Sequence, residues 1–207
     1  MTHTNHRSGT TESLEHDFVV LMMADKGINA QGATEKIRRF LDLAWKRGAA
    51  NLGDGRRGNT HLLGFEGLHE GVADRTVAHA LFRDARTLSA FLTDLRQADL
   101  GLSVAVSGLF DITASCCREA GLKPHAHEYS GGVWGRVDKM PGERQLEVMT
   151  MCGHGFVPAA LVDHLVEKVK QGILTPQEAG LTMTRQCLCG AFNPERAAEI
   201  VAAMAAG

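Results

Sequence analysis

The sequence predicts a mixed α/β fold in which a sheet packs against helices and the C-terminal part is helical. Short apolar runs typical of buried strands alternate with amphipathic stretches typical of helices up to about residue 150, and only helix signals follow. The chain of 207 residues is 44% hydrophobic and 22% charged, which is the composition of an ordinary globular domain. We expect either one sheet-and-helix sandwich or two ferredoxin-like halves.

The first half of the chain contains the clearest strand and helix signals. Short apolar or alternating runs predict strands at residues 18–23, 77–82 and 102–107. Apolar side chains that recur on one helical face predict helices at residues 33–47, 85–95 and 109–120. Gly48 and Gly121 are well placed to end the first and third of these helices.

Residues 51–71 hold six glycines and have no regular apolar period, so they predict a long surface loop. Arg56 and Arg57 lie within it. Exposed backbone amides beside two guanidinium groups could hold a carboxylate or phosphate, although no phosphate-loop spacing is present. The stretch is therefore either a plain surface loop or a substrate lid with Arg56 and Arg57 as substrate contacts.

The second half begins with two extended segments, at residues 125–129 and 133–137, which we expect to form a hairpin around three small residues. Residues 146–151 predict the strand that leads into Cys152. Helix signals then dominate: an apolar stripe over residues 157–171, a capping box from Thr175 to Glu178, and Asn193 as the N-cap of the last helix.

These elements suggest a flexible N-terminal tail at residues 1–16, an α/β part at 17–140 and a cysteine-bearing strand with helices at 141–207, packed into the same domain. The net charge of −2 gives no basic face for nucleic acid. No apolar run approaches the ~20 residues that span a bilayer, and the polar N-terminus lacks signal-peptide features. We therefore expect a cytoplasmic protein that acts on a small molecule and leave open whether it forms a homo-oligomer.

Three cysteines of the second half stand beside glycines and expected helix starts. Cys152 lies between the expected strand and a helix, where exposed N–H groups favour thiolate over thiol. Cys187 and Cys189 are two residues apart, so in an extended segment both sulfurs face the same side. The helices between residues 152 and 187 allow the chain to fold back. We predict that the three cysteines ligate one metal or cluster.

The donor set suggests an iron–sulfur centre. Three cysteines suit a [4Fe–4S] cluster with one iron free to bind a substrate as a Lewis acid. His154 would then serve as a nearby acid/base or hydrogen-bond donor. With His154 as the fourth ligand the site would instead be a closed zinc site, although the spacing is not the usual zinc spacing. A catalytic thiol without metal, or simple burial, are the remaining alternatives.

The segment Met151-Cys152-Gly153-His154-Gly155 resembles the motif around the first catalytic cysteine of the proline racemase family. The resemblance covers five residues and implies a thiolate that exchanges a substrate α-proton. In that family a second cysteine, in an Asp-Arg-Ser-Pro-Cys-Gly-Thr-Gly setting, works on the opposite face. The segment around Cys187 and Cys189 departs from that setting, so we interpret the resemblance as local.

The leading hypothesis is thus an iron–sulfur enzyme of the lyase, hydratase or sulfur-handling kind. A metal-free isomerase that uses Cys152 and a zinc-stabilised interaction module are the alternatives. The sequence leaves open whether Cys116, Cys117, His125 or His127 join the site.

Overall fold

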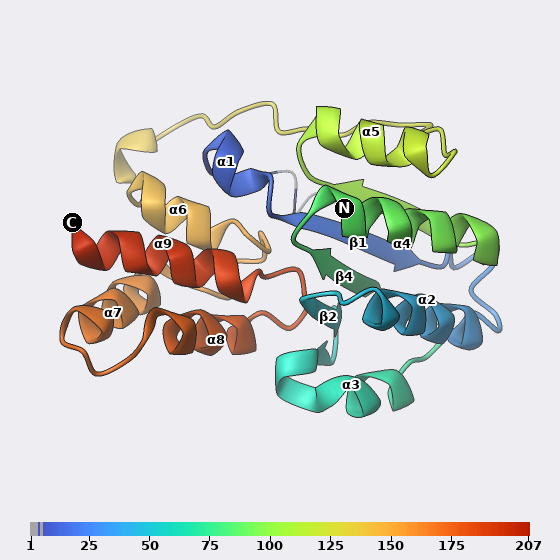
Figure 1. Cartoon of the computed structure of the whole chain (residues 1–207), viewed down its shortest axis with the longest axis horizontal. Coiled ribbons are helices and arrows are strands. Elements are labelled where there is room, and N and C mark those ends of the chain that lie inside the picture. The colour runs from blue at the N-terminus through green and yellow to red at the C-terminus, as the bar shows by residue number, and fades with distance from the viewer. Residues whose placement is uncertain (1–3, 5) are drawn as a thin grey trace.

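The structure is a computed structural model that describes residue 4 and residues 6–207, and it confirms the predicted mixed α/β fold (Figure 1). Five strands form one sheet in the order β3-β2-β4-β1-β5, and every neighbouring pair is antiparallel. The strands are β1 (Phe18–Met23), β2 (Asn51–Asp54), β3 (Gly58–Asn59), β4 (Ala78–Phe82) and β5 (Ser103–Ser107). The three strands predicted in the first half of the chain are confirmed as β1, β4 and β5.

The connections of this sheet define a ferredoxin-like unit. Strands β1 and β2 both pair with β4, so they run parallel to each other, and helix α2 (Thr34–Lys46) joins them. In the same way β4 and β5 flank β1, and helix α4 (Ala85–Ala98) joins them. Two interleaved split βαβ units are the ferredoxin-like arrangement. Within the described residues there is one such unit in one sheet. Of the two predicted arrangements, the chain therefore forms one sheet-and-helix sandwich and not two ferredoxin-like halves.

Helices α2 and α4 cover one face of the sheet and form the larger core. Alternate residues of β1, which are Phe18, Val20 and Met22, point into this core because side chains of a strand alternate between faces. Phe40 of α2 and Phe91 of α4 meet there edge to face, with ring centroids 5.4 Å apart. Helix α5 (Phe110–Glu119) packs against α4 at the rim.

The C-terminal helices form a second core that reaches the other face of the sheet. Val19 and Leu81, which point away from the first core, belong to it. The helices are α6 (Glu143–Met149), α7 (Ala159–Lys170), α8 (Pro176–Gln186) and α9 (Pro194–Ala206), gathered at one end of the molecule in Figure 1. The predicted caps at Thr175 and Asn193 are confirmed. Two loops, between α6 and α7 and between α8 and α9, carry the three cysteines.

Three local predictions are wrong. The expected strand at residues 146–151 is mostly helix α6, because its short apolar run fits a buried helical turn as well as a strand. The expected loop at residues 51–71 contains β2, β3 and helix α3 (Thr60–Glu70), which is kinked at Gly64. The expected hairpin at residues 125–137 has no strand; a 3₁₀ turn η1 (Val137–Lys139) follows it.

The N-terminal residues bear on the site. Residues 1–3 and 5 of the predicted tail lie outside the described residues. The side chain of Arg7 makes four hydrogen bonds, and α1 (Thr11–Leu14) forms a short helix. The division into three parts stays a prediction. Across the described part of the chain, no helix has the length and apolarity needed to cross a membrane.

Candidate metal centre

The structure brings the three predicted cysteines together from two loops. Cys152, Cys187 and Cys189 are at most 1% exposed, and all three Sγ atoms lie within 4.8 Å of one another. The sulfurs of Cys187 and Cys189 are 3.4 Å apart. Among the described residues, no other group of three or more His, Cys, Asp or Glu side chains meets this spacing. The site therefore offers three converging sulfurs, and the described part of the chain adds no fourth ligand of these types.

The sequence predicted Cys152 at the start of a helix, and this prediction is wrong. Helix α6 ends at Met149 and α7 begins only at Ala159, so the dipole of α7 does not act on the Cys152 thiol. Its sulfur instead accepts hydrogen bonds from the thiols of Cys187 and Cys189 and from the backbone N–H of His154, which hold the pKa of Cys152 far below its usual range.

The same hydrogen bonds act in the opposite direction on the two donors. The bond to the Cys152 sulfur raises the pKa of Cys189 to about 12 and also raises that of Cys187, since donation favours the protonated thiol. Burial adds to both shifts. At this spacing the charge on one sulfur acts on the other two. A cation bound among the three sulfurs would favour their deprotonated forms and compensate the buried negative charge.

Cys187 is the C-cap residue of α8, and its backbone is already extended, with φ −85° and ψ 95°. The side-chain amide of Asn59 donates to the carbonyl oxygens of Thr184 (2.8 Å) and Cys187 (2.6 Å). Asn59 is fully buried, and its side-chain oxygen also caps α3. The junction between β3 and α3 therefore fixes the end of α8 beside the sulfurs.

The backbones of Gly53 in β2 and Gly190 after Cys189 touch each other. A β-carbon on Gly53 would collide with the carbonyl group of Cys189, and one on Gly190 would collide with the backbone of β2. Gly190 also has a φ of +79°, a conformation that favours glycine. Two glycines thus allow the second cysteine loop to lie directly on the sheet.

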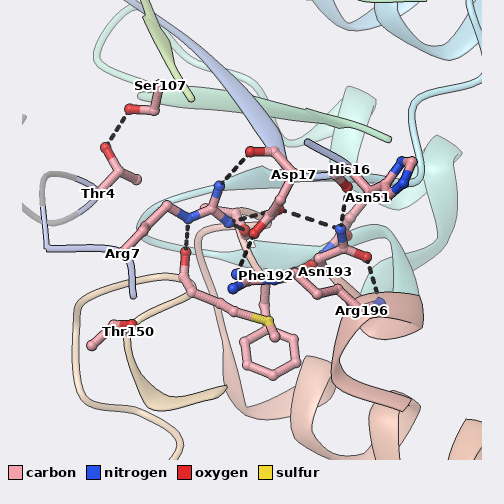
Figure 2. Close-up of polar contacts among 12 residues, drawn as sticks. Thr4, Arg7, His16, Asp17, Asn51, Ser107, Thr150, Phe192, Asn193 and Arg196 are labelled. Atoms are coloured by element: carbon pink, nitrogen blue, oxygen red, sulfur yellow. Dashed lines mark hydrogen bonds and ion pairs between the residues drawn. The ribbon is translucent and has the colours of Figure 1, made fainter. Parts of the chain in front are cut away.

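A buried polar network joins both cysteine loops to the N-terminal segment (Figure 2). Arg7 donates from Nε to the carbonyl of Met151 (2.7 Å) and from Nη2 to the carbonyl of Ala191 (3.0 Å). The same guanidinium pairs with the Asp17 carboxylate at 2.9 Å, and Arg196 pairs with the other oxygen of that carboxylate at 2.7 Å. The two arginines share the carboxylate of Asp17. Only the side chain of Arg7 also donates to the backbone of the two cysteine loops.

The other predicted site residues lie outside the sulfur cluster. His154 is exposed, and its ring packs near Phe156 with centroids 5.5 Å apart. Arg56 and Arg57 are exposed in the turn between β2 and β3, and the guanidinium of Arg57 lies against Gly71 at the end of α3. Their roles as acid/base and as substrate contacts stay predictions.

The cysteines and histidines left open by the sequence belong to other parts of the molecule. Cys116 and Cys117 are buried in the core formed by α2 and α4, where burial raises the pKa of each thiol. His125 and His127 are exposed and line a cavity of about 590 Å³ between β5 and residues 122–130. Arg7 and Asp17 also line this cavity, whereas the three clustered cysteines do not.

Several residues that shape the site were not found from the sequence. Asn193 gave a capping signal, but its side-chain amide also donates to the carbonyl of His16 (3.0 Å). Arg7 and Asn59 gave no signal, because each acts through contacts to residues more than 100 positions away. The local sequence signals for the site were the short spacing of Cys187 and Cys189 and the glycines beside the cysteines.

Comparison of the chain with protein family models, curated proteins and solved structures finds no match. The functional assignment therefore depends on the three sulfurs and on the residues that hold them.

Proposed function

We propose that this protein is a metalloprotein in which Cys152, Cys187 and Cys189 bind the metal. The observation that carries the proposal is the convergence of three fully buried sulfurs within 4.8 Å of one another. A metal explains why two loops are held together so tightly, because a buried thiolate is costly unless a positive charge compensates it.

The sulfur spacing favours a single thiophilic ion such as zinc. A zinc–sulfur bond of about 2.3 Å in a tetrahedral site places its sulfurs about 3.8 Å apart. The separation of 3.4 Å between the Cys187 and Cys189 sulfurs and the 4.8 Å limit for all three bracket that distance. A [4Fe–4S] cluster binds each cysteine to a different iron and so needs its sulfurs farther apart.

The [4Fe–4S] cluster is the second candidate, and the donor count favours it. Three protein thiolates leave one iron of such a cluster open for a substrate, and no fourth His, Cys, Asp or Glu joins the three sulfurs in the described part of the chain. Binding of the cluster would require the two loops to separate.

Either centre would be an enzyme site more readily than a structural one. Three protein ligands with an open position are the pattern of catalytic metal sites, where the metal polarises a substrate oxygen or activates water. Gly153, His154 and Gly155 are exposed, so a small molecule could approach along this loop. In this proposal His154 is the acid/base, Arg56 and Arg57 contact an anionic group of the substrate, and the reaction is of the lyase or hydratase kind.

A metal-free isomerase with Cys152 as its base is supported less well. The racemase-like motif needs the thiolate at a helix start, and here α7 begins only at Ala159.

A protein with reduced thiolate ligands also fits a reducing compartment, which is why we propose a cytoplasmic location.

Purification without chelators and without oxygen, followed by analysis of metal and acid-labile sulfide, tests the proposal. One zinc-type ion per chain in colourless protein supports the single-ion site, and a brown protein with iron and sulfide supports the cluster. Cys152→Ala should lose the metal, whereas Cys116→Ala, a buried cysteine of the other core, should keep it. Wild-type protein that contains and binds no metal, with one unusually reactive thiol, would refute both candidates in favour of the isomerase.

A further inference from the structure

We infer that Arg7 and Asn59 are positioning residues of the metal centre and that the N-terminal segment is therefore an integral part of that centre. The inference rests on the proposed metal-binding function. It assigns to two residues far from the cysteines in sequence the task of holding the sulfurs in a binding geometry.

Arg7 connects the two cysteine loops through a single planar group. Its guanidinium donates to the carbonyl of Met151, the residue before Cys152, and to the carbonyl of Ala191, two residues after Cys189. The same group donates to the backbone carbonyl and the carboxylate of Asp17, immediately before β1. All of its contacts are therefore to fixed acceptors, and its side chain is only 6% exposed.

Asn59 acts in the same way on the third cysteine. Its amide nitrogen donates to the carbonyls of Thr184 and Cys187, which are the last turn and the C-cap of α8. Carbonyls at the end of a helix lack the regular partners of the helix interior. The Asn59 amide supplies a donor to the Cys187 carbonyl and a second donor to the Thr184 carbonyl, which also accepts from the backbone N–H of Cys187. Arg7 and Asn59 together hold backbone groups next to all three sulfurs.

This arrangement matters because the ligands come from separate loops. Without external contacts the loop of Cys152 and the loop of Cys187 and Cys189 would have to be ordered by the metal itself, and that ordering would weaken binding. Residues that orient metal ligands change affinity by about 10- to 100-fold when they are removed. The effect should therefore appear in metal affinity and not only in the stability of the fold.

The test compares Arg7→Met with Arg196→Met in the full-length protein. Both variants lose a buried ion pair with Asp17, but only the first loses contacts to the cysteine loops. Zinc affinity is measured by competition with a chromophoric chelator, and thermal unfolding of the metal-free proteins is measured beside it. We expect about a 10-fold or larger loss of zinc affinity for Arg7→Met and less than about a threefold change for Arg196→Met.

Two further variants keep the test decisive if Arg7→Met does not fold. Arg7→Lys keeps the positive charge beside Asp17 but cannot span both carbonyls, so it should fold and still bind zinc more weakly. Asn59→Ser keeps an N-cap acceptor for α3 but loses the amide that holds Cys187, and it should also bind zinc more weakly.

Wild-type protein that binds no metal would refute the proposed function itself. Wild-type protein that binds zinc, with unchanged affinity in folded Arg7→Lys and Asn59→Ser, would refute the positioning role while leaving the metal centre intact. Loss of affinity in Arg196→Met equal to that in Arg7→Met would likewise refute it, because a general loosening of the fold would then explain both.

Discussion

The backbone of Gly53 in the sheet lies in direct contact with the carbonyl group of Cys189, so closely that no side chain fits between them. This contact fixes the distance from the ferredoxin-like sheet to the second cysteine loop. Asn51 reinforces it two residues earlier, since its amide donates to the carbonyl of Phe192 at 3.0 Å. The cysteine cluster is thus built on the sheet and not only on the C-terminal helices.

Gly53→Ala should displace the second cysteine loop. The added methyl group meets backbone atoms that cannot rotate away, so we expect a loss of about 2 kcal/mol in the free energy of unfolding, together with weaker metal binding. Gly55→Ala, in the same hairpin, is the matched control, because its methyl group would have only one neighbour, at 3.9 Å. Urea denaturation of both variants measures the difference, and equal stabilities would contradict the contact.

Asp17→Asn should be among the most destabilising single changes. It removes the charge that two buried arginines share, and loss of one partner of a buried ion pair costs about 3–5 kcal/mol. Asp94→Asn breaks the more exposed pair with Arg47 and should cost at most about 1 kcal/mol. Denaturant unfolding of both variants checks the contrast. Similar losses would mean that the network of Arg7 and Arg196 does not stabilise the fold.

The sequence predicted most of the ferredoxin-like sheet because its signals are local. The apolar run of β1 and the amphipathic faces of α2 and α4 repeat with the period of their own element. β2 was missed because its residues Asn51–Asp54 include a glycine and two polar side chains, which are not typical of a strand. Asn51 and Gly53 contact the distant second cysteine loop, and Asp54 accepts from Thr76 and from the backbone of Arg56. Tertiary contacts here override local preference.

In the candidate site, too, local sequence signals were predictive and long-range contacts were not. The convergence of Cys152 with Cys187 and Cys189 could be predicted from their spacing and neighbouring glycines. The expectation of a strand and a helix start at Cys152 was wrong, because residues 146–151 form a short apolar run that fits either element. The roles of Arg7 and Asn59 depend on contacts across the whole chain, which no single sequence displays.

The capping box of α8 makes a prediction about pH. The backbone N–H and hydroxyl of Thr175 donate to Glu178 and lower the pKa of its carboxyl group. A carboxyl whose pKa is lower in the folded than in the unfolded state stabilises the fold above the unfolded pKa of about 4.3, and this stabilisation is lost as the pH falls through the folded value.

Glu178→Gln keeps a side-chain acceptor for the capping box without the charge. The wild-type protein should therefore be more stable than this variant at pH 7, and the difference should shrink when the pH is lowered below the folded pKa. Unfolding of both proteins at neutral and acidic pH measures it. A difference that does not change with pH would contradict the role of the Glu178 charge.

Thiol labelling should separate the two groups of cysteines. In metal-free protein at neutral pH, iodoacetamide should react first with Cys152, because hydrogen bonds from Cys187 and Cys189 keep it as thiolate. Cys116 and Cys117 should react more slowly than Cys152, since burial in the core raises their pKa values. Mass spectrometry of peptides from partially labelled protein gives the order. Added zinc should suppress the labelling of Cys152 and leave Cys116 and Cys117 unchanged.

Titration of reduced, metal-free protein with cobalt(II) tests the central claim most directly, because thiolate ligation of cobalt gives a charge-transfer absorption that reports on the sulfurs themselves. We predict that the absorption saturates at one cobalt per chain in the wild-type protein and in Cys116→Ala. It should be lost or strongly reduced in Cys152→Ala. The absence of any saturable thiolate–cobalt absorption in the folded wild-type protein, or an absorption unaffected by Cys152→Ala, would contradict a metal centre at the three converging cysteines.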